Sequence, residues 1–138
     1  MQEQLISFET AKLAKEKGFC NGSDGCYFQF TEDYIYDDDS NHPESYKKDE
    51  IRFYEFFHRN DFKHDYCEAP TQSLLQKWLR EKHHLIIIVA YQYEHDSTPY
   101  SYWSYKESQS LPINQWVNYL KTYEEALEMG LQDALKLI

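Results

Sequence analysis

Apolar residues first recur at helical spacing directly after Ser7, at Phe8, Ala11 and Ala14. The Ser7 hydroxyl can accept a hydrogen bond from a free backbone N–H, as residues that precede a helix commonly do. Gly18 suits the left-handed backbone that often ends a helix. These features predict a helix that starts at residue 8 and ends before residue 18.

From Cys26 onward, apolar and polar positions alternate, which is typical of a strand. We predict strands at 26–30, 34–36, 51–57, 85–93 and 100–106, the last two forming a hairpin. Aromatic residues on both sides of 51–57 predict burial on both sides, or contact of one face with a helix. The unbroken apolar run that opens 85–93 predicts a strand covered on both faces. The charged stretch 37–50 is expected to be a loop, and 58–70 to be irregular.

Two further helices are predicted in the second half of the chain. The first starts at Thr71 and ends at His83-His84, with an apolar stripe at Leu74, Leu75, Trp78 and Leu79. The second starts with the capping box Thr122-x-x-Glu125. Its apolar face would comprise Tyr123, Leu127, Leu131, Ala134, Leu135 and Ile138. Gly130 inside this helix indicates a close approach to the sheet.

The element order therefore predicts an α+β fold, with a mostly antiparallel sheet of about four to five strands packed against three helices. The length of 138 residues suits one domain over residues 1–138. The longest apolar run, 85–90, is too short to cross a bilayer, and residues 1–5 lack a signal-peptide charge pattern. We therefore expect a cytoplasmic protein without a membrane partner.

The charge of the chain favours some partners over others. Asp and Glu number 24 against 14 Lys and Arg, a formal charge of −10. Residues 31–69 hold twelve acids and five bases. This balance repels the phosphate backbone, so nucleic acid is not the expected partner. The chain also holds 13 Tyr and 3 Trp, which are enriched at protein interfaces. We expect a protein partner, bound through an acidic, Tyr-rich surface. An alternative is that the acidic segment 27–66 imitates DNA and occupies a DNA-binding protein.

Candidate metal sites are incomplete in sequence. Cys20, Cys26 and Cys67 with His64 could form a Cys3His zinc site, but the usual close Cys spacing is missing. Asp37-x-Asp39-x-Asn41 opens like an EF-hand loop, and the match fails at His42 and Lys48. We therefore assign no metal, cofactor-binding or catalytic residue and expect no cofactor.

Two other hypotheses concern activity. The helix at 71–84 followed by the hairpin has the element order of a winged-helix DNA reader, with Lys77, Arg80 and Lys82 on its polar side. The helix that a helix-turn-helix needs upstream is missing from the predicted elements. A small hydrolytic or metal-dependent enzyme would have to assemble a Cys-His site from His58, His64 and Cys67 with Asp61 or Asp65.

Three blocks of sequence, at 6–19, 69–82 and 123–138, cover about a third of the chain and coincide with the predicted helices. Their order and spacing resemble a family of small uncharacterised proteins encoded by bacteriophages and prophages, notably those of gut bacteria. The resemblance implies a phage or prophage origin and a bacterial cytoplasm, and no activity or catalytic residue is carried over from it. The acidic charge, the excess of Tyr and Trp and the lack of a catalytic signature lead us to favour a non-enzymatic accessory protein.

Overall fold

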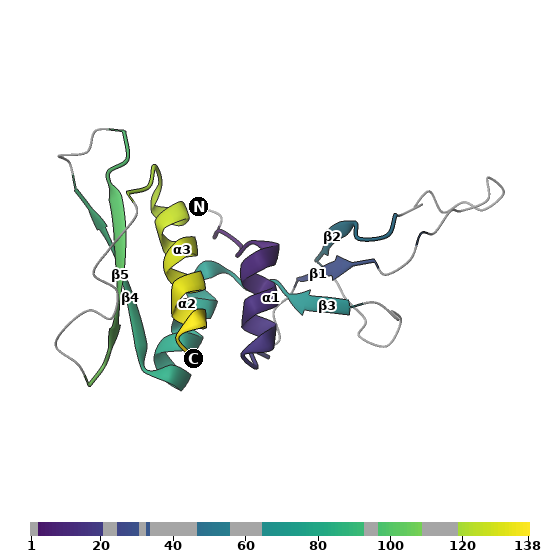
Figure 1. Ribbon diagram of the computed structural model, residues 1–138, viewed down its shortest axis with the longest axis horizontal. Coiled ribbons are helices and arrows are strands. Elements are labelled where there is room, and N and C mark those ends of the chain that lie inside the picture. Colours follow the sequence, from purple (N-terminus) through teal and green to yellow (C-terminus); the bar gives the residue numbers. More distant parts are fainter. Residues whose placement is uncertain are drawn as a thin grey trace.

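The computed structural model describes residues 3–20, 25–30, 33, 47–55, 65–92, 97–108 and 119–138. Three helices lie between two antiparallel sheets (Figure 1). The elements are α1 (Phe8–Glu16), β1 (Cys26–Gln29), β2 (Ile51–Tyr54), β3 (Asp65–Glu68), α2 (Gln72–His83), β4 (Leu85–Tyr91), β5 (Tyr100–Lys106) and α3 (Tyr123–Lys136). The prediction of an α+β fold with three helices and about four to five mostly antiparallel strands is confirmed, but the strands form two sheets where we predicted one.

The predicted caps of the helices are present. The side chains of Ser7, Thr71 and Thr122 accept the N–H groups of Thr10, Leu74 and Glu125 at the starts of the three helices, and the Glu125 side chain completes the capping box. Gly18 has a φ of +86° directly after α1. His84 ends α2 with a φ of 56°, also in the left-handed region.

β1 is the central strand of the three-stranded sheet, paired with β2 on one side and with β3 on the other. β3 lies where we predicted irregular chain, so that expectation was wrong. Burial of β2 on both sides was also wrong, because Ile51 and Phe53 are exposed. They share a face with Tyr27 and Cys67, and α1 covers only the β1–β3 side of that face.

β4 and β5 form the predicted hairpin. Leu85 and Ile87 are buried against α2 and α3, whereas Ile88 on the opposite face is 41% exposed. The expectation that this strand is covered on both faces was wrong, because Ile88 is exposed and the helices of the described residues lie on one side of the sheet. The strand is apolar on both sides for two different reasons. One face is buried by the helices, and the residues of the other face lie beside Trp103 and Tyr105 of β5.

One hydrophobic core connects the helices and both sheets. It contains Leu75 and Leu79 of α2, Leu131 and Leu135 of α3, Ala11 and Ala14 of α1, Ile87 of β4 and Cys67 of β3. A Cβ atom at Gly130 would lie 2.8 Å from Ile87 Cγ2 and 3.2 Å from the Tyr102 ring, which confirms the predicted close approach of α3 to the sheet. Within the described ranges, the helices are too short or too polar to cross a bilayer.

Several predicted features lie outside the described residues. These are the strand at 34–36, most of the loop at 37–50, and the ends of the strands predicted at 51–57 and 85–93.

Candidate functional site

A polar cluster around Glu128 joins the N-terminal ends of the three helices. The Glu128 carboxylate accepts the Ser7 N–H at 2.7 Å, the Thr10 hydroxyl, and Gln72 Nε2 at 3.0 Å. Gln72 Nε2 also lies 3.0 Å from the Glu124 carbonyl oxygen. Thr10 and Gln72 are buried, so this cluster fixes the segment before α1 and the start of α2 against α3.

A groove of about 900 Å³ opens beside this cluster, and we call it the N-terminal groove. One wall is the extended segment 3–7 and the other is the start of α3. Its lining comprises residues 3–7, Tyr27, Gln72, Leu120, Thr122, Glu124, Glu125, Glu128 and Met129. The Tyr27 hydroxyl donates to the Ile6 carbonyl at 2.7 Å, and burial, followed by the charge of Glu128, raises the pKa of Tyr27. Tyr27 is therefore a neutral hydrogen-bond donor in this groove.

The charge of the groove follows from the helix arrangement. α1 and α3 run in the same direction, since Ser7 and Thr10 meet Glu128 while Lys17 reaches the Ile138 carbonyl (Figure 1). α2 also starts beside the first turns of α3, where Gln72 contacts Glu124 and Glu128. Each helix N-terminus carries about half a positive charge, or about one and a half in total. Four carboxylates line the groove, and its described lining contains no Lys, Arg or His. The groove therefore keeps a net negative potential.

Three tyrosines form a cluster next to the groove, and we call them the tyrosine cluster. Tyr91 and Tyr100 are cross-strand partners with ring centroids 5.3 Å apart, and Tyr123 packs edge-on against Tyr100 at 6.4 Å. Tyr91 is 62% exposed and Tyr123 is 45% exposed. Leu120 connects the two features, because its backbone pairs with Tyr100 and its side chain lines the groove.

The sequence prediction placed Tyr123 on the buried face of its helix, and the structure corrects this. α3 begins beside Tyr100, the first residue of β5, so the sheet ends before it can cover the first turn of the helix. Leu127 and Leu131, farther along the same face, are buried as predicted. A tyrosine at the first position of a helix, together with tyrosines that flank the turn of a hairpin, was the available signal for this cluster.

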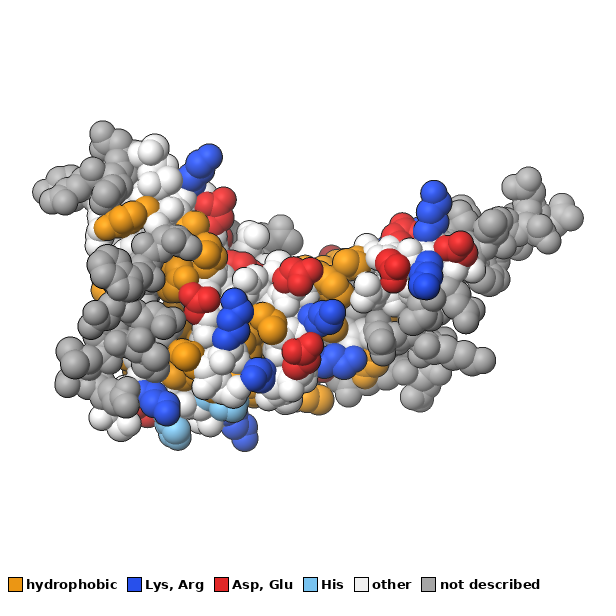
Figure 2. Space-filling view, viewed as in Figure 1, with side chains coloured by type: hydrophobic (Ala, Val, Ile, Leu, Met, Phe, Trp, Pro, Cys, Tyr) orange, Lys and Arg blue, Asp and Glu red, His pale blue; other side chains and the backbone are white. Residues whose placement is uncertain are grey.

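The predicted acidic surface is only partly within the described residues. On the face drawn in Figure 2, acidic and basic side chains are interspersed over the helices. The described residues include 12 of the 14 basic residues of the chain and 15 of the 24 acidic ones. The DNA-mimic hypothesis depended on 27–66, where Asp37, Asp38 and Asp39 lie outside the described residues.

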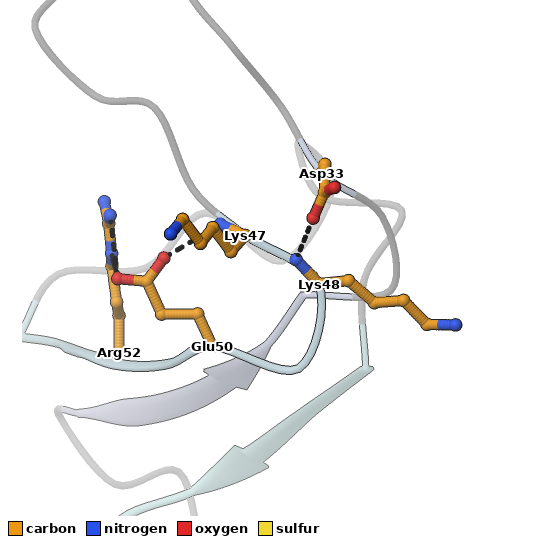
Figure 3. A network of polar contacts seen from close by, with 5 residues as sticks. All are labelled: Asp33, Lys47, Lys48, Glu50 and Arg52. Atoms are coloured by element: carbon orange, nitrogen blue, oxygen red, sulfur yellow. Dashed lines mark hydrogen bonds and ion pairs between the residues drawn. The ribbon is translucent and has the colours of Figure 1, made fainter.

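Only the last part of the EF-hand-like segment, from Lys47 onward, lies within the described residues. Figure 3 shows the turn before β2, where the Lys48 N–H donates to Asp33 Oδ1 at 2.6 Å and the Lys48 amine points away. Glu50 accepts the Lys47 N–H at 3.0 Å and the Arg52 guanidinium at 3.0 Å. These bonds, the Lys47 N–H first and Arg52 next, lower the pKa of Glu50. Both carboxylates are thus engaged by the protein's own donors.

The proposed Cys3His site is divided by the three-stranded sheet. Cys26 lies opposite Glu68 on β3, whereas Cys67 lies opposite Tyr27, so the two buried thiols point to opposite faces. Cys20 is exposed, and His64 lies outside the described residues, as do His58 and Asp61. Among the described residues, no group of three His, Cys, Asp or Glu side chains could hold a metal ion.

The helix of the DNA-binding hypothesis, α2, is mainly a core helix. Leu75, Trp78 and Leu79 are buried, and Lys77, Arg80 and Lys82 are exposed. The element directly before α2 is the strand β3, where a helix-turn-helix would have a helix. Burial, and then the charges of His84 and Lys82, lower the pKa of His83, so His83 adds no positive charge at neutral pH.

No protein-family model, curated protein or solved structure matches this chain. The tyrosine cluster and the N-terminal groove are therefore the features on which a function can be proposed.

Proposed function

We propose that this chain is a non-enzymatic accessory protein of the phage type that binds another protein, and that the tyrosine cluster is its contact surface. The observation that carries the proposal is the exposure of Tyr91 and Tyr123 on a rigid support. Exposed apolar and aromatic side chains that lie together in one patch often mark a surface that binds another protein. Tyrosine is enriched in the contact residues that dominate protein interfaces.

The cluster is held in one arrangement before any partner binds. Tyr91 and Tyr100 belong to paired strands, and Tyr123 to the capped first turn of α3. Edge-on ring contacts restrict the side chains further. Little conformational entropy would be lost when such side chains are buried in an interface, which favours binding.

A capture experiment tests this proposal. The chain is immobilised, a lysate of a bacterial host is passed over it, and retained proteins are quantified by mass spectrometry. We expect a reproducible partner whose recovery falls at least about tenfold with Tyr91→Ser and Tyr123→Ser together. Leu137→Ser, at a comparably exposed position at the other end of α3, is the matched control and should retain it. Equal recovery by all three proteins, or turnover of a small substrate without any partner, would contradict the proposal.

A second candidate is DNA binding through α2, favoured by the exposure of Lys77, Arg80 and Lys82. An electrophoretic shift assay at low salt separates it from the first. A shift that is lost in Lys77→Glu with Arg80→Glu would support DNA binding, and no shift with the parent protein would remove it.

A further inference from the structure

We infer that the N-terminal groove binds an extended segment of the partner protein in which Lys or Arg alternates with apolar residues. This inference rests on the proposed function in one respect, that the partner is a protein. The groove lies beside the tyrosine cluster, and Leu120 contributes to the boundary of both. A partner seated on the tyrosines would therefore reach the groove without a long connection.

Backbone geometry favours an extended occupant. Along segment 3–7, the Ile6 N–H donates to the Pro70 carbonyl and the Gln4 carbonyl accepts the Gln72 N–H. The Ser7 N–H points the other way, to Glu128 of α3. In extended chain these directions alternate, so the N–H and C=O of Leu5 face the α3 side, where the groove lies. They form no hydrogen bond with the described residues, and an added strand would pair with them.

Charge selects the side chains of that segment. Glu128 is committed to Ser7, Thr10 and Gln72, and Glu125 caps α3 through its contacts with the backbone of Lys121 and Thr122. The Glu124 carboxylate is exposed and has no partner among the described residues, and Glu3 shares one oxygen with Ser73. Two carboxylates therefore remain for cations at the rim. Leu120 and Met129 provide apolar surface between the walls for the alternate residues.

The groove contains more carboxylates than are needed to balance the partial positive charges of the helix N-termini. Carboxylates at helix N-termini are common because they offset the partial positive charge there. In this groove, however, four carboxylates face about one and a half opposite charges. The excess gives a cationic segment an attraction that an acidic or neutral one lacks.

Fluorescence anisotropy with two labelled short peptides tests this inference. One peptide alternates Lys with Val and the other alternates Glu with Val. We expect the Lys peptide to bind, with an affinity that falls as salt rises, and the Glu peptide not to bind. Glu3→Gln with Glu124→Gln should weaken binding about five- to tenfold, because two partly exposed ion pairs are lost. Glu9→Gln, an exposed acid in the first turn of α1 outside the groove, should leave it unchanged.

Each other outcome overturns the inference. Absence of binding, equal binding of both peptides, or equal affinity of the double variant and the Glu9→Gln control would do so. Concentration-dependent self-association that the double variant abolishes would assign the groove to a second copy of the chain. If the Lys peptide fails while capture still depends on Tyr91 and Tyr123, only the groove inference is lost. If the peptide binds as expected and capture does not depend on the tyrosines, the proposed function fails instead.

Discussion

Replacing Glu128 with alanine should destabilise the whole fold, because its carboxylate is the shared acceptor for three donors, two at the start of α1 and one at the start of α2. Glu128→Ala removes the partner of the Thr10 hydroxyl and one partner of Gln72 Nε2, both in buried residues. A buried donor left without its acceptor costs about 1–3 kcal/mol. Ser7 Oγ at 3.0 Å and the Glu124 carbonyl offer the two donors partial replacements. We therefore expect a loss of about 2–4 kcal/mol in the free energy of unfolding.

Urea denaturation followed by circular dichroism measures this loss, with the slope compared to check that the transition stays two-state. Glu128→Gln keeps one acceptor oxygen and should lose only about 1 kcal/mol. Glu124→Gln, one helical turn earlier and exposed, is the matched control and should change stability by less than about 0.5 kcal/mol. A loss below about 1 kcal/mol for Glu128→Ala, or equal losses for all three variants, would refute this role for the cluster.

Three further predictions concern packing and charge. Gly130→Ala should destabilise by about 0.5–2 kcal/mol in urea denaturation, since the overpacking against Ile87 exceeds the gain in helix propensity; a stabilised variant would show that α3 can shift. Ser104→Ala should raise the unfolding free energy by about 1 kcal/mol, because the buried Ser104 hydroxyl has no partner in the described part of the chain; a decrease would reveal one. Arg52→Ala should raise the pKa of Glu50 toward its ordinary value in an NMR titration. Because that pKa is lowered in the folded protein, the Glu50 contribution is present above the ordinary Glu pKa and is lost as pH falls through the folded value; an unchanged pKa would contradict the Arg52 contact.

The helices could be predicted from sequence because their signals are local. Ser7, Thr71 and Thr122 each bond to an N–H three residues later, and Gly18 adopts the left-handed conformation that few other residues accept. Gly130 was also informative. A glycine inside a helix lowers stability, so its presence indicates that another element packs too closely for a larger side chain. These inferences required no knowledge of distant contacts.

The division into two sheets could not be predicted, because strand pairing depends on residues far apart in sequence. β3 has only Tyr66 and Cys67 between two acids, too short a pattern to distinguish from irregular chain, and its pairing with β1 defines it as a strand. The apolar run of β4 suggested two covered faces, but the helices cover one. Composition alone does not say which side of a sheet remains open.

The place of the tyrosine cluster could not be predicted from sequence. The excess of Tyr and the acidity led us to expect a protein-binding surface without a location, and this expectation stays a prediction. The tyrosine cluster joins the end of the hairpin to α3, because the short sheet leaves Tyr123 uncovered. Cys26 and Cys67 point to opposite faces of the sheet because of the register between β1 and β3. The spacing of the cysteines in the sequence does not reveal this register.

Site-specific photo-crosslinking tests the central claim most directly. Benzoylphenylalanine is placed at position 91, 123 or 137 in turn, and the chain is irradiated in a host lysate. Tyr91 and Tyr123 lie in the proposed contact surface, and Leu137 lies at the other end of α3 with a comparable exposed fraction to Tyr123. We predict that the same partner protein is crosslinked from positions 91 and 123 and is not crosslinked from 137. Crosslinks from 137 alone, or none from 91 and 123, would show that the tyrosine cluster is not where this protein binds its partner.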